Sequence, residues 1–367
     1  MKPRPRASQH QQQLFPPSSG ASLRLPVIGN QGDIRYHGSP ARSILNGPAT
    51  TGMDFWSINP YVGCAFGCAY CYARYTHRYA LERVAAMPEV DRSLRWDAAV
   101  MPPWLAFERR VLVKENAAEA LRRDLRAHGD KLVGETIVIG TATDPYQPAE
   151  RRFKITRGLL EVLADFHGPE LVIITKSPLV TRDLDLLQKI AGRTRVCVHI
   201  TIITLDRALA RRIEMRAPPP EARAQALAKL RAGGIEAGVN IMPVLPGITD
   251  REEDLEALVK RVSEAGASSV SACALRLQSA ARARYLPFIE QEFPELAGRY
   301  RRSYARSHQV SQDYRRSLSS RVRALCEKYG IPVSRRDDDD ADAAQGMEAD
   351  APPRPIAPLP VQLEMGV

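Results

Sequence analysis

Three of the six cysteines in this chain fall within eight positions, and this short run constrains the protein more than any other feature. Cys64, Cys68 and Cys71 follow a C-x3-C-x2-C spacing inside residues 59–72, which read NPYVGCAFGCAYCY. Three thiolates on one loop can hold one metal centre. Structural zinc wants four protein ligands, whereas a cubane iron-sulfur cluster on three cysteines keeps one iron without a protein ligand. The spacing therefore predicts a metal centre with one position open for chemistry.

Two simpler interpretations of the same cysteines stay open at this point. His77, six residues after Cys71, could complete a zinc site, or the three cysteines could be unligated core residues. Structural zinc sites usually pair two C-x2-C-like knuckles, and the sequence has no second knuckle. A zinc or iron-sulfur protein that binds nucleic acid without catalysis remains the alternative to an enzyme.

The cysteine run resembles the signature of the radical S-adenosylmethionine superfamily, which is C-x3-C-x2-C with an aromatic residue just before the third cysteine. Tyr70 occupies that place. The flanking residues resemble the spore photoproduct lyase-related branch, and the resemblance runs from about residue 45 to residue 332. The flanking residues that carry it are Asn59, Pro60, Tyr61, Gly63, Tyr72, Ala73, Arg74 and His77.

The resemblance implies two cofactors and one protein partner. The cofactors are a 4Fe-4S cluster on Cys64, Cys68 and Cys71 and S-adenosyl-L-methionine bound at the fourth iron. Reductive cleavage of S-adenosylmethionine would then give a 5'-deoxyadenosyl radical that abstracts hydrogen from the substrate. The electron would come from a donor of the flavodoxin or ferredoxin type. Tyr70 and Tyr72 would lie near the adenine.

Length and composition favour one main globular domain in the cytoplasm. The chain has 367 residues and 44% hydrophobic content, which is enough for a large core. No run of eighteen apolar residues appears, and the start MKPRPRASQHQQQLFPP has no apolar core of the signal-peptide kind, so we expect no membrane association. A reducing cytoplasm also suits free thiols.

Short apolar runs alternate with amphipathic stretches through the middle of the chain, which predicts an α/β fold with a parallel sheet covered by helices. Periodicity does not separate an open sheet from a barrel, but the resemblance implies a partial (β/α)6 TIM-type barrel. Helices are expected over 116–128, 157–166, 183–191 and 251–265. Six strands are expected, at 55–58, 135–143, 171–175, 196–204, 236–244 and 269–277.

Composition divides the chain into four parts. We predict a disordered basic arm over 1–45 that docks late in its length, and a radical S-adenosylmethionine core over 46–280. A basic helical extension follows over 281–336, and residues 337–367 form an acidic and Pro-rich disordered tail.

Polar residues at strand ends are the candidates for cofactor binding, because ligands sit at the carboxyl ends of parallel strands. Thr143 and Asp144 follow the second strand, and Lys176 follows the third. In the resembled family these segments meet the methionine part of S-adenosylmethionine, whose ammonium and carboxylate would pair with Asp144 and Lys176. Asp144 could instead cap the turn at Pro145, and Lys176 could be an ordinary solvated lysine.

The substrate is less constrained by the sequence. The branch suggests lyase-like action on a damaged nucleobase, but photoproduct lyases carry a hydrogen-donating cysteine in the second-strand segment, where this chain has Thr141 or a neighbour. A metabolite, a protein or an RNA is therefore the alternative substrate. Cys197 and Cys273 lie in predicted strands as small hydrophobic residues or, alternatively, hydrogen-atom donors. His199 is expected to be a buried, hydrogen-bonded histidine outside the site.

The extension carries a possible nucleic-acid surface. The chain has a formal net charge of +10, and residues 299–336 hold eleven Lys or Arg against two acids. Tyr300, Tyr304, Tyr314 and Tyr329 are interleaved with them and could stack on bases, or simply pack on the body. Helical spacing of Leu318, Val322, Leu325 and Tyr329 predicts an amphipathic helix there.

Overall fold

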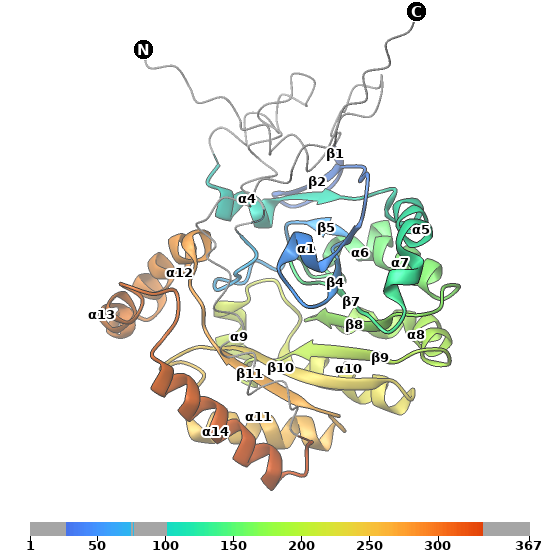
Figure 1. Cartoon of the computed structure of the whole chain (residues 1–367). Coiled ribbons are helices and arrows are strands. Elements are labelled where there is room, and N and C mark those ends of the chain that lie inside the picture. Colours follow the sequence, from blue (N-terminus) through green and yellow to red (C-terminus); the bar gives the residue numbers. More distant parts are fainter. Residues whose placement is uncertain (1–26, 75, 77–100, 333–367) are drawn as a thin grey trace, which may run out of the picture.

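The computed structural model describes residues 27–74, 76 and 101–332. Its main sheet has the strand order β11-β10-β9-β8-β7-β4-β3 (Figure 1). Neighbouring strands from β4 to β11 run parallel, and only β3 (Leu45–Asn46) pairs antiparallel, with β4. The six parallel strands are β4 (Trp56–Ile58), β7 (Thr136–Ile139), β8 (Glu170–Thr175), β9 (Val196–Thr201), β10 (Glu236–Val244) and β11 (Val270–Ala274).

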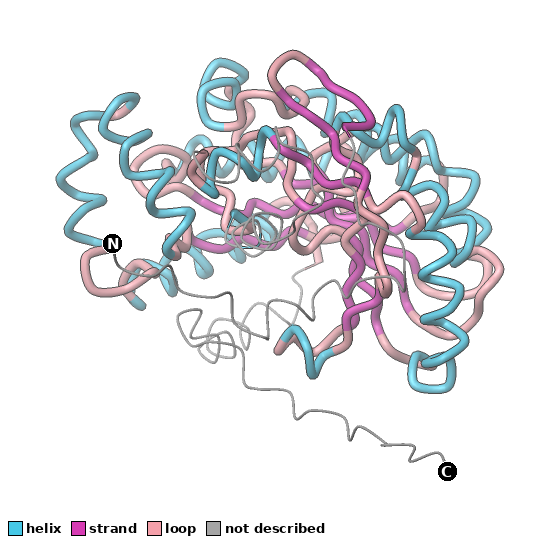
Figure 2. The backbone as a smooth tube through the Cα atoms, turned by 90° about the horizontal axis from the view of Figure 1, so that it is seen from above, coloured by secondary structure: helices cyan, strands magenta, loops and turns pink. Residues whose placement is uncertain are grey.

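Each of these six strands overlaps one of the six predicted ones, although β7, β9 and β11 are shorter than predicted, and the fold is the expected α/β partial barrel of the TIM type. The helices lie outside the strands, as both views show (Figure 2). Apolar residues of the strands and of the facing helices form one large core. The helices that follow or link these strands are α5 (Ala117–His128), α6 (Pro148–Phe153), α7 (Ile155–Leu163), α8 (Leu184–Ala191), α9 (Arg207–Ile213), α10 (Pro220–Ala232) and α11 (Glu252–Glu264), with the short turns α1 (Pro48–Thr51), η1 (Gly129–Leu132) and η2 (Pro178–Asp183).

A second, smaller sheet was not predicted from the sequence. Its strand order is β1-β2-β6-β5, formed by β1 (Val27–Gln31), β2 (Ile34–Gly38), β6 (Arg110–Val113) and β5 (Tyr61–Val62). The prediction of a disordered arm was therefore wrong for residues 27–45, although docking late in the arm was expected. Ile34 and Tyr36 supply the physical reason, because they bury their side chains against Val111 and Val113 in a small core.

The extension after β11 is helical, as expected. It consists of α12 (Ser279–Glu292), α13 (Pro294–Ser303) and α14 (Gln312–Lys328), and Leu318, Val322 and Leu325 on α14 face the body. The base-stacking role considered for Tyr300 and Tyr304 was wrong, because these side chains are 2% and 1% exposed. The Tyr304 hydroxyl donates to the Leu275 carbonyl oxygen over 3.0 Å, so the ring is part of the core.

Some predictions fall outside the described residues. These concern His77, residues 1–26 of the basic arm, and residues 337–367 of the tail. Within the described part, no helix combines the length and the apolar character needed to cross a bilayer.

Candidate functional site

The three clustered cysteines lie on a loop that begins directly after β5 and folds onto the rim of the barrel. The Cys64 amide donates to the Phe107 carbonyl oxygen over 2.9 Å, and the Ala69 amide donates to that of Ile213 over the same distance. Phe107 belongs to α4 (Pro103–Arg109). Gly63 and Gly67 take positive φ values of 88° and 67°, which lets the loop turn tightly between these anchors.

A cluster of charged side chains, formed by Arg74, Glu108 and Arg216, holds the cysteine loop. Arg74, fully buried, donates to the Cys68 carbonyl oxygen over 2.6 Å and lies 3.6 Å from Glu108. Arg216 donates from Nη2 to Glu108 over 2.6 Å and from Nε to the Ala65 carbonyl oxygen over 2.5 Å. Because charged donors make strong hydrogen bonds in a buried setting, the loop is held in one conformation.

The three thiols are free of disulfides and lie within electrostatic reach of one another. Burial raises the pKa of Cys64 well above its usual range, and burial followed by the nearby Glu214 raises the pKa of Cys68 to about 12. Among the described residues, no three His, Cys, Asp or Glu side chains converge closely enough for a single metal ion. Three free thiols on one loop could hold an iron-sulfur cluster, and binding iron would displace their protons.

Thr143 and Gln147 clamp the loop to the end of β7. The Thr143 hydroxyl donates to the Gly63 carbonyl oxygen over 2.6 Å. The Gln147 amide donates to the same oxygen over 3.0 Å, and its carbonyl oxygen accepts from the Ala65 amide over 2.9 Å. Gln147 is fully buried. Sequence reasoning did not select this residue, although it follows Asp144 by only three positions.

Asp144 ties the ends of β7 and β8 together. Its carboxylate accepts from the Thr175 hydroxyl over 2.7 Å, the Lys176 amide over 2.8 Å and the Tyr146 amide over 2.9 Å. The last contact is the turn cap that was the alternative role for Asp144. Burial raises the pKa of this carboxyl, and the three hydrogen bonds work against that shift. The structure thus brings Asp144 and Lys176 to adjoining strand ends.

The Lys176 ammonium lies next to Tyr70 on the cysteine loop and next to the buried Glu214–Arg223 ion pair. Its Nζ lies 5.6 Å from the centre of the Tyr70 ring and 4.0 Å from a carboxylate oxygen of Glu214. Glu214 accepts hydrogen bonds from the Tyr70 hydroxyl and from Arg223. Burial lowers the pKa of Lys176, but the negative charges of Cys68 and Glu214 outweigh it and raise the pKa overall. Glu214 and Arg223 were missed by sequence reasoning, since no motif marks them.

Tyr72 lies on the solvent side of the loop with 51% of its surface exposed. Its hydroxyl donates to the Thr141 carbonyl oxygen, while the Asn59 amide donates to the Thr141 hydroxyl over 3.0 Å. Thr141 therefore sits at the end of β7 beside the loop, which is the segment expected for a hydrogen donor.

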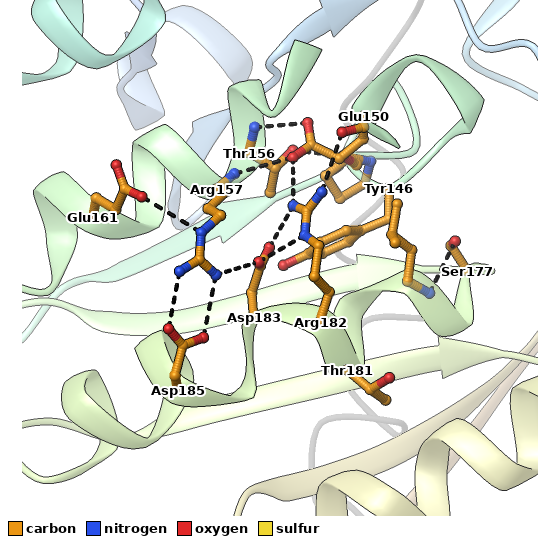
Figure 3. Close-up of polar contacts among 12 residues, drawn as sticks. Tyr146, Glu150, Thr156, Arg157, Glu161, Ser177, Thr181, Arg182, Asp183 and Asp185 are labelled. Atoms are coloured by element: carbon orange, nitrogen blue, oxygen red, sulfur yellow. Dashed lines mark hydrogen bonds and ion pairs between the residues drawn. The ribbon is translucent and has the colours of Figure 1, made fainter. Parts of the chain in front are cut away.

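A second buried network holds the segment that carries Asp144 and Gln147. Glu150 is fully buried and accepts from the Tyr61 hydroxyl over 2.5 Å and from Arg182 over 2.7 Å. Figure 3 shows Arg182 between Glu150 and Asp183, with Arg157 on the other side of Asp183. The network links β5, α6, α7 and η2. It therefore holds the segments that follow β7 and β8 against β5, the strand that precedes the cysteine loop.

The remaining cysteine candidates lie at different depths of the barrel. Cys197 is the second residue of β9 and pairs with Glu236 at the start of β10, so it sits at the amino edge of the sheet. Its sulfur lies 3.5 Å from Nε2 of His199, which is half-buried. Cys273 is half-buried and next to last in β11, near the carboxyl edge. Cys273 therefore lies near the end of the barrel formed by the carboxyl ends of the strands, whereas Cys197 lies near the opposite end.

Comparison with known proteins decides the family. The profile of the Radical SAM superfamily matches residues 58–261, which is more than half of the chain and contains the cysteine loop and strands β7 to β10. The chain belongs to the radical S-adenosylmethionine superfamily. An uncharacterized protein of Mycobacterium tuberculosis is 34% identical over 317 residues, covering 86% of each chain. One of Methanocaldococcus jannaschii is 31% identical over 195 residues, covering 53% of this chain and 62% of its own length.

Solved structures of spore photoproduct lyase share the fold. One variant superposes with a TM-score of 0.58 at 14% identity, covering 84% of this chain and 86% of its own. Another, solved with bound S-adenosylmethionine and dinucleoside spore photoproduct, gives a TM-score of 0.51 at 14% identity, covering 76% and 75%. The chain therefore shares its fold with spore photoproduct lyase. At 14% sequence identity this similarity concerns the fold alone.

Proposed function

We propose that this protein is a radical S-adenosylmethionine enzyme that reductively cleaves S-adenosylmethionine at a 4Fe-4S cluster bound by Cys64, Cys68 and Cys71. One observation carries the proposal: three free thiols share one anchored loop at the barrel rim, beside the strand ends that hold Asp144 and Lys176. When bound, the cluster and S-adenosylmethionine supply a 5'-deoxyadenosyl radical. An electron donor of the flavodoxin or ferredoxin type would supply the reductant.

The protein's own residues bind, orient and shield. Lys176 offers a partly buried positive charge at the end of β8 for the methionine carboxylate, since Glu214 is 4.0 Å away and its carboxylate already has two donors. Thr143 and Gln147 fix the loop, while Tyr70 is buried and Tyr72 is exposed at the entrance. The ammonium of the methionine part would lie near Asp144, whose carboxylate also orders the backbone at Lys176.

For the substrate, we propose lyase-like action on a nucleobase within nucleic acid. Support comes from the net charge of +10 and from the shared fold with a lyase solved with a dinucleoside photoproduct. Thr141 at the end of β7, instead of a cysteine, favours an alternative in which a metabolite, a protein or an RNA is modified. Cys273, near the carboxyl edge of the sheet, remains a candidate hydrogen-atom donor.

Anaerobic reconstitution tests the proposed chemistry. We expect about four irons and four sulfides per chain, as a cubane cluster requires, and conversion of S-adenosylmethionine to 5'-deoxyadenosine and methionine with dithionite. Cys68→Ala should abolish both the cluster and the cleavage. Cys197→Ala is the matched control, because it removes a buried thiol at the opposite edge of the sheet and should leave both intact. Colourless protein with one zinc, or S-adenosylmethionine that survives hours with a reduced brown protein, would contradict the proposal.

A further inference from the structure

Glu214 joins four separate elements of the site through one buried carboxylate. It lies directly after α9 and is 1% exposed. One carboxylate oxygen accepts from the hydroxyl of Tyr70, the residue before Cys71, and the other accepts from Arg223 on α10. Arg223 in turn donates to the Thr201 carbonyl oxygen at the end of β9 over 3.0 Å. Through Arg223 and Lys176, this side chain connects the cysteine loop to the carboxyl ends of β9 and β8.

The same carboxylate lies beside two cations near one of the cysteines, the buried Arg223 and the partly buried Lys176. Arg223 is 1% exposed, and Lys176 holds its ammonium 4.0 Å from Glu214. Lys176, Arg223 and Glu214 all act electrostatically on Cys68. These three side chains together carry a net charge of +1. A buried cation without a counterion is costly, so Glu214 is what allows both cations to remain there.

We propose that Glu214 is a positioning residue that aligns Lys176 with the cysteine loop and, together with Lys176, sets the reduction potential of the bound cluster. The inference rests on the proposed function, since it needs a cluster on Cys68. Reduction potentials of iron-sulfur clusters depend on the charges and hydrogen bonds around them. A negative charge near the cluster makes it harder to reduce, and a positive charge makes it easier.

Opposite substitutions test this idea by their signs. Glu214→Gln keeps the shape and one acceptor oxygen, replaces the other oxygen with an amide NH2 group and removes a negative charge, so the potential should become more positive. Lys176→Met removes a positive charge, so the potential should become more negative. The double variant should return toward the wild-type value. The measurement is an anaerobic titration with dithionite and mediators, followed by the spectrum of the reduced cluster.

The control is Glu236→Gln, the same substitution at the first residue of β10, on the opposite edge of the sheet. Its potential should equal that of the wild type. If Glu214→Gln does not fold, Lys176→Met still tests whether the charges beside Cys68 set the potential, because it leaves the Glu214–Arg223 pair in place, and an unchanged potential in that variant would overturn the inference. Thermal unfolding of the iron-free variants separates lost stability from a shifted potential. Replacing a residue with a purely structural role would lower the unfolding temperature and leave the reduction potential unchanged.

The outcomes distinguish this inference from the function on which it rests. A chain that assembles its cluster and cleaves S-adenosylmethionine, but shows no shift of opposite sign in the two variants, overturns the role of Glu214 alone. A chain that holds no cluster overturns the proposed function and this inference together. Opposite shifts that cancel in the double variant support it.

Discussion

At the scale of single residues, two side chains at neighbouring strand ends decide how the cofactor would be held. The ammonium of Lys176 lies at the candidate site, whereas the carboxylate of Asp144 accepts hydrogen bonds from Thr175, Lys176 and Tyr146. These contacts make Asp144 an organiser of the strand ends as well as a candidate ligand. Both roles depend on a carboxylate at this position, so they predict the same loss of binding when it is removed.

We therefore expect Lys176→Ala and Asp144→Ala to weaken S-adenosylmethionine binding while the cluster survives. Truncating one member of a partly buried charged contact often costs about 2 to 5 kcal/mol. Equilibrium binding to the reconstituted, unreduced protein measures the effect. Lys189→Ala is the control, because that ammonium pairs with Asp165 on the surface. Unchanged affinity in both site variants would mean that Asp144 and Lys176 do not take part in binding S-adenosylmethionine.

Lys114 gives a prediction about pH. Its ammonium donates to the Asn59 carbonyl oxygen over 2.7 Å, and burial lowers its pKa from 10.5 to about 8. The unfolded chain then binds more protons than the folded one between these two values, so this residue makes stability rise with pH across that window and reduces stability below it. The cysteine thiols of the unfolded chain also titrate in this pH range. The comparison must therefore be with a variant that lacks only Lys114.

The expected result is a difference between wild type and Lys114→Met that changes with pH. Urea unfolding of the iron-free proteins should show the wild type gaining stability relative to the variant as pH rises from 8 to 10.5. A constant difference across that range would mean that Lys114 keeps an ordinary pKa in the fold.

At the scale of elements, the cysteine loop depends on glycine where it crosses its supporting ion pair. Gly67 has a φ of 67°, and a Cβ there would lie 2.2 Å from both Arg216 Nη2 and Glu108 Oε2. The left-handed conformation alone costs an ordinary residue about 1 to 2 kcal/mol. Parting a buried ion pair adds about 3 to 5 kcal/mol when one partner is left alone. Substitution should therefore disturb the loop much more than strain alone would.

Gly67→Ala should lower the unfolding free energy of the iron-free protein by about 3 kcal/mol or more and reduce iron uptake. Gly52→Ala is a matched control, because Gly52 has a φ of 69° and nothing lies within 4 Å of its would-be Cβ. That variant should show only the conformational cost and normal iron content. Equal losses in the two variants would rule out the steric contact with the Arg216–Glu108 pair.

At the scale of the whole molecule, local sequence pattern predicted the strands of a parallel sheet and the family resemblance predicted the barrel, but neither predicted the smaller sheet or the buried contacts that support it. The six strands follow from short apolar runs such as LVIIT, which are local signals. The small sheet escaped prediction because β2 and β6 pair across more than seventy residues, and two short strands of it carry little apolar pattern. Glu214 escaped for the same reason, since its contact with Tyr70 spans 144 positions. Contacts between distant residues leave no periodic trace in either segment.

The extension supplies the last prediction, which concerns the partner. Arg301, Arg302 and Arg306 lie at the end of α13 and just after it, and all three are exposed. Arg301 shares its charge with Glu290 over 2.6 Å, so the other two are the stronger candidates for phosphate contacts. Tyr300 and Tyr304 lie in the core, so any binding here should be electrostatic rather than based on stacking.

If this surface binds nucleic acid, affinity must fall steeply with salt, because each neutralised phosphate releases counterions and adds about 0.7 to 0.9 to the log-log slope. Replacing Arg301, Arg302 and Arg306 with Gln should flatten the slope for labelled single-stranded DNA, duplex DNA and RNA. The control replaces Arg122, Arg123 and Arg126, three exposed arginines on α5 at the opposite side of the molecule from α13 (Figure 1). Since both triple variants lose the same formal charge, a selective effect of the first locates the contact on the extension. Equal effects would indicate attraction by net charge alone, and binding no tighter than millimolar at low salt would turn the search to a metabolite or protein substrate.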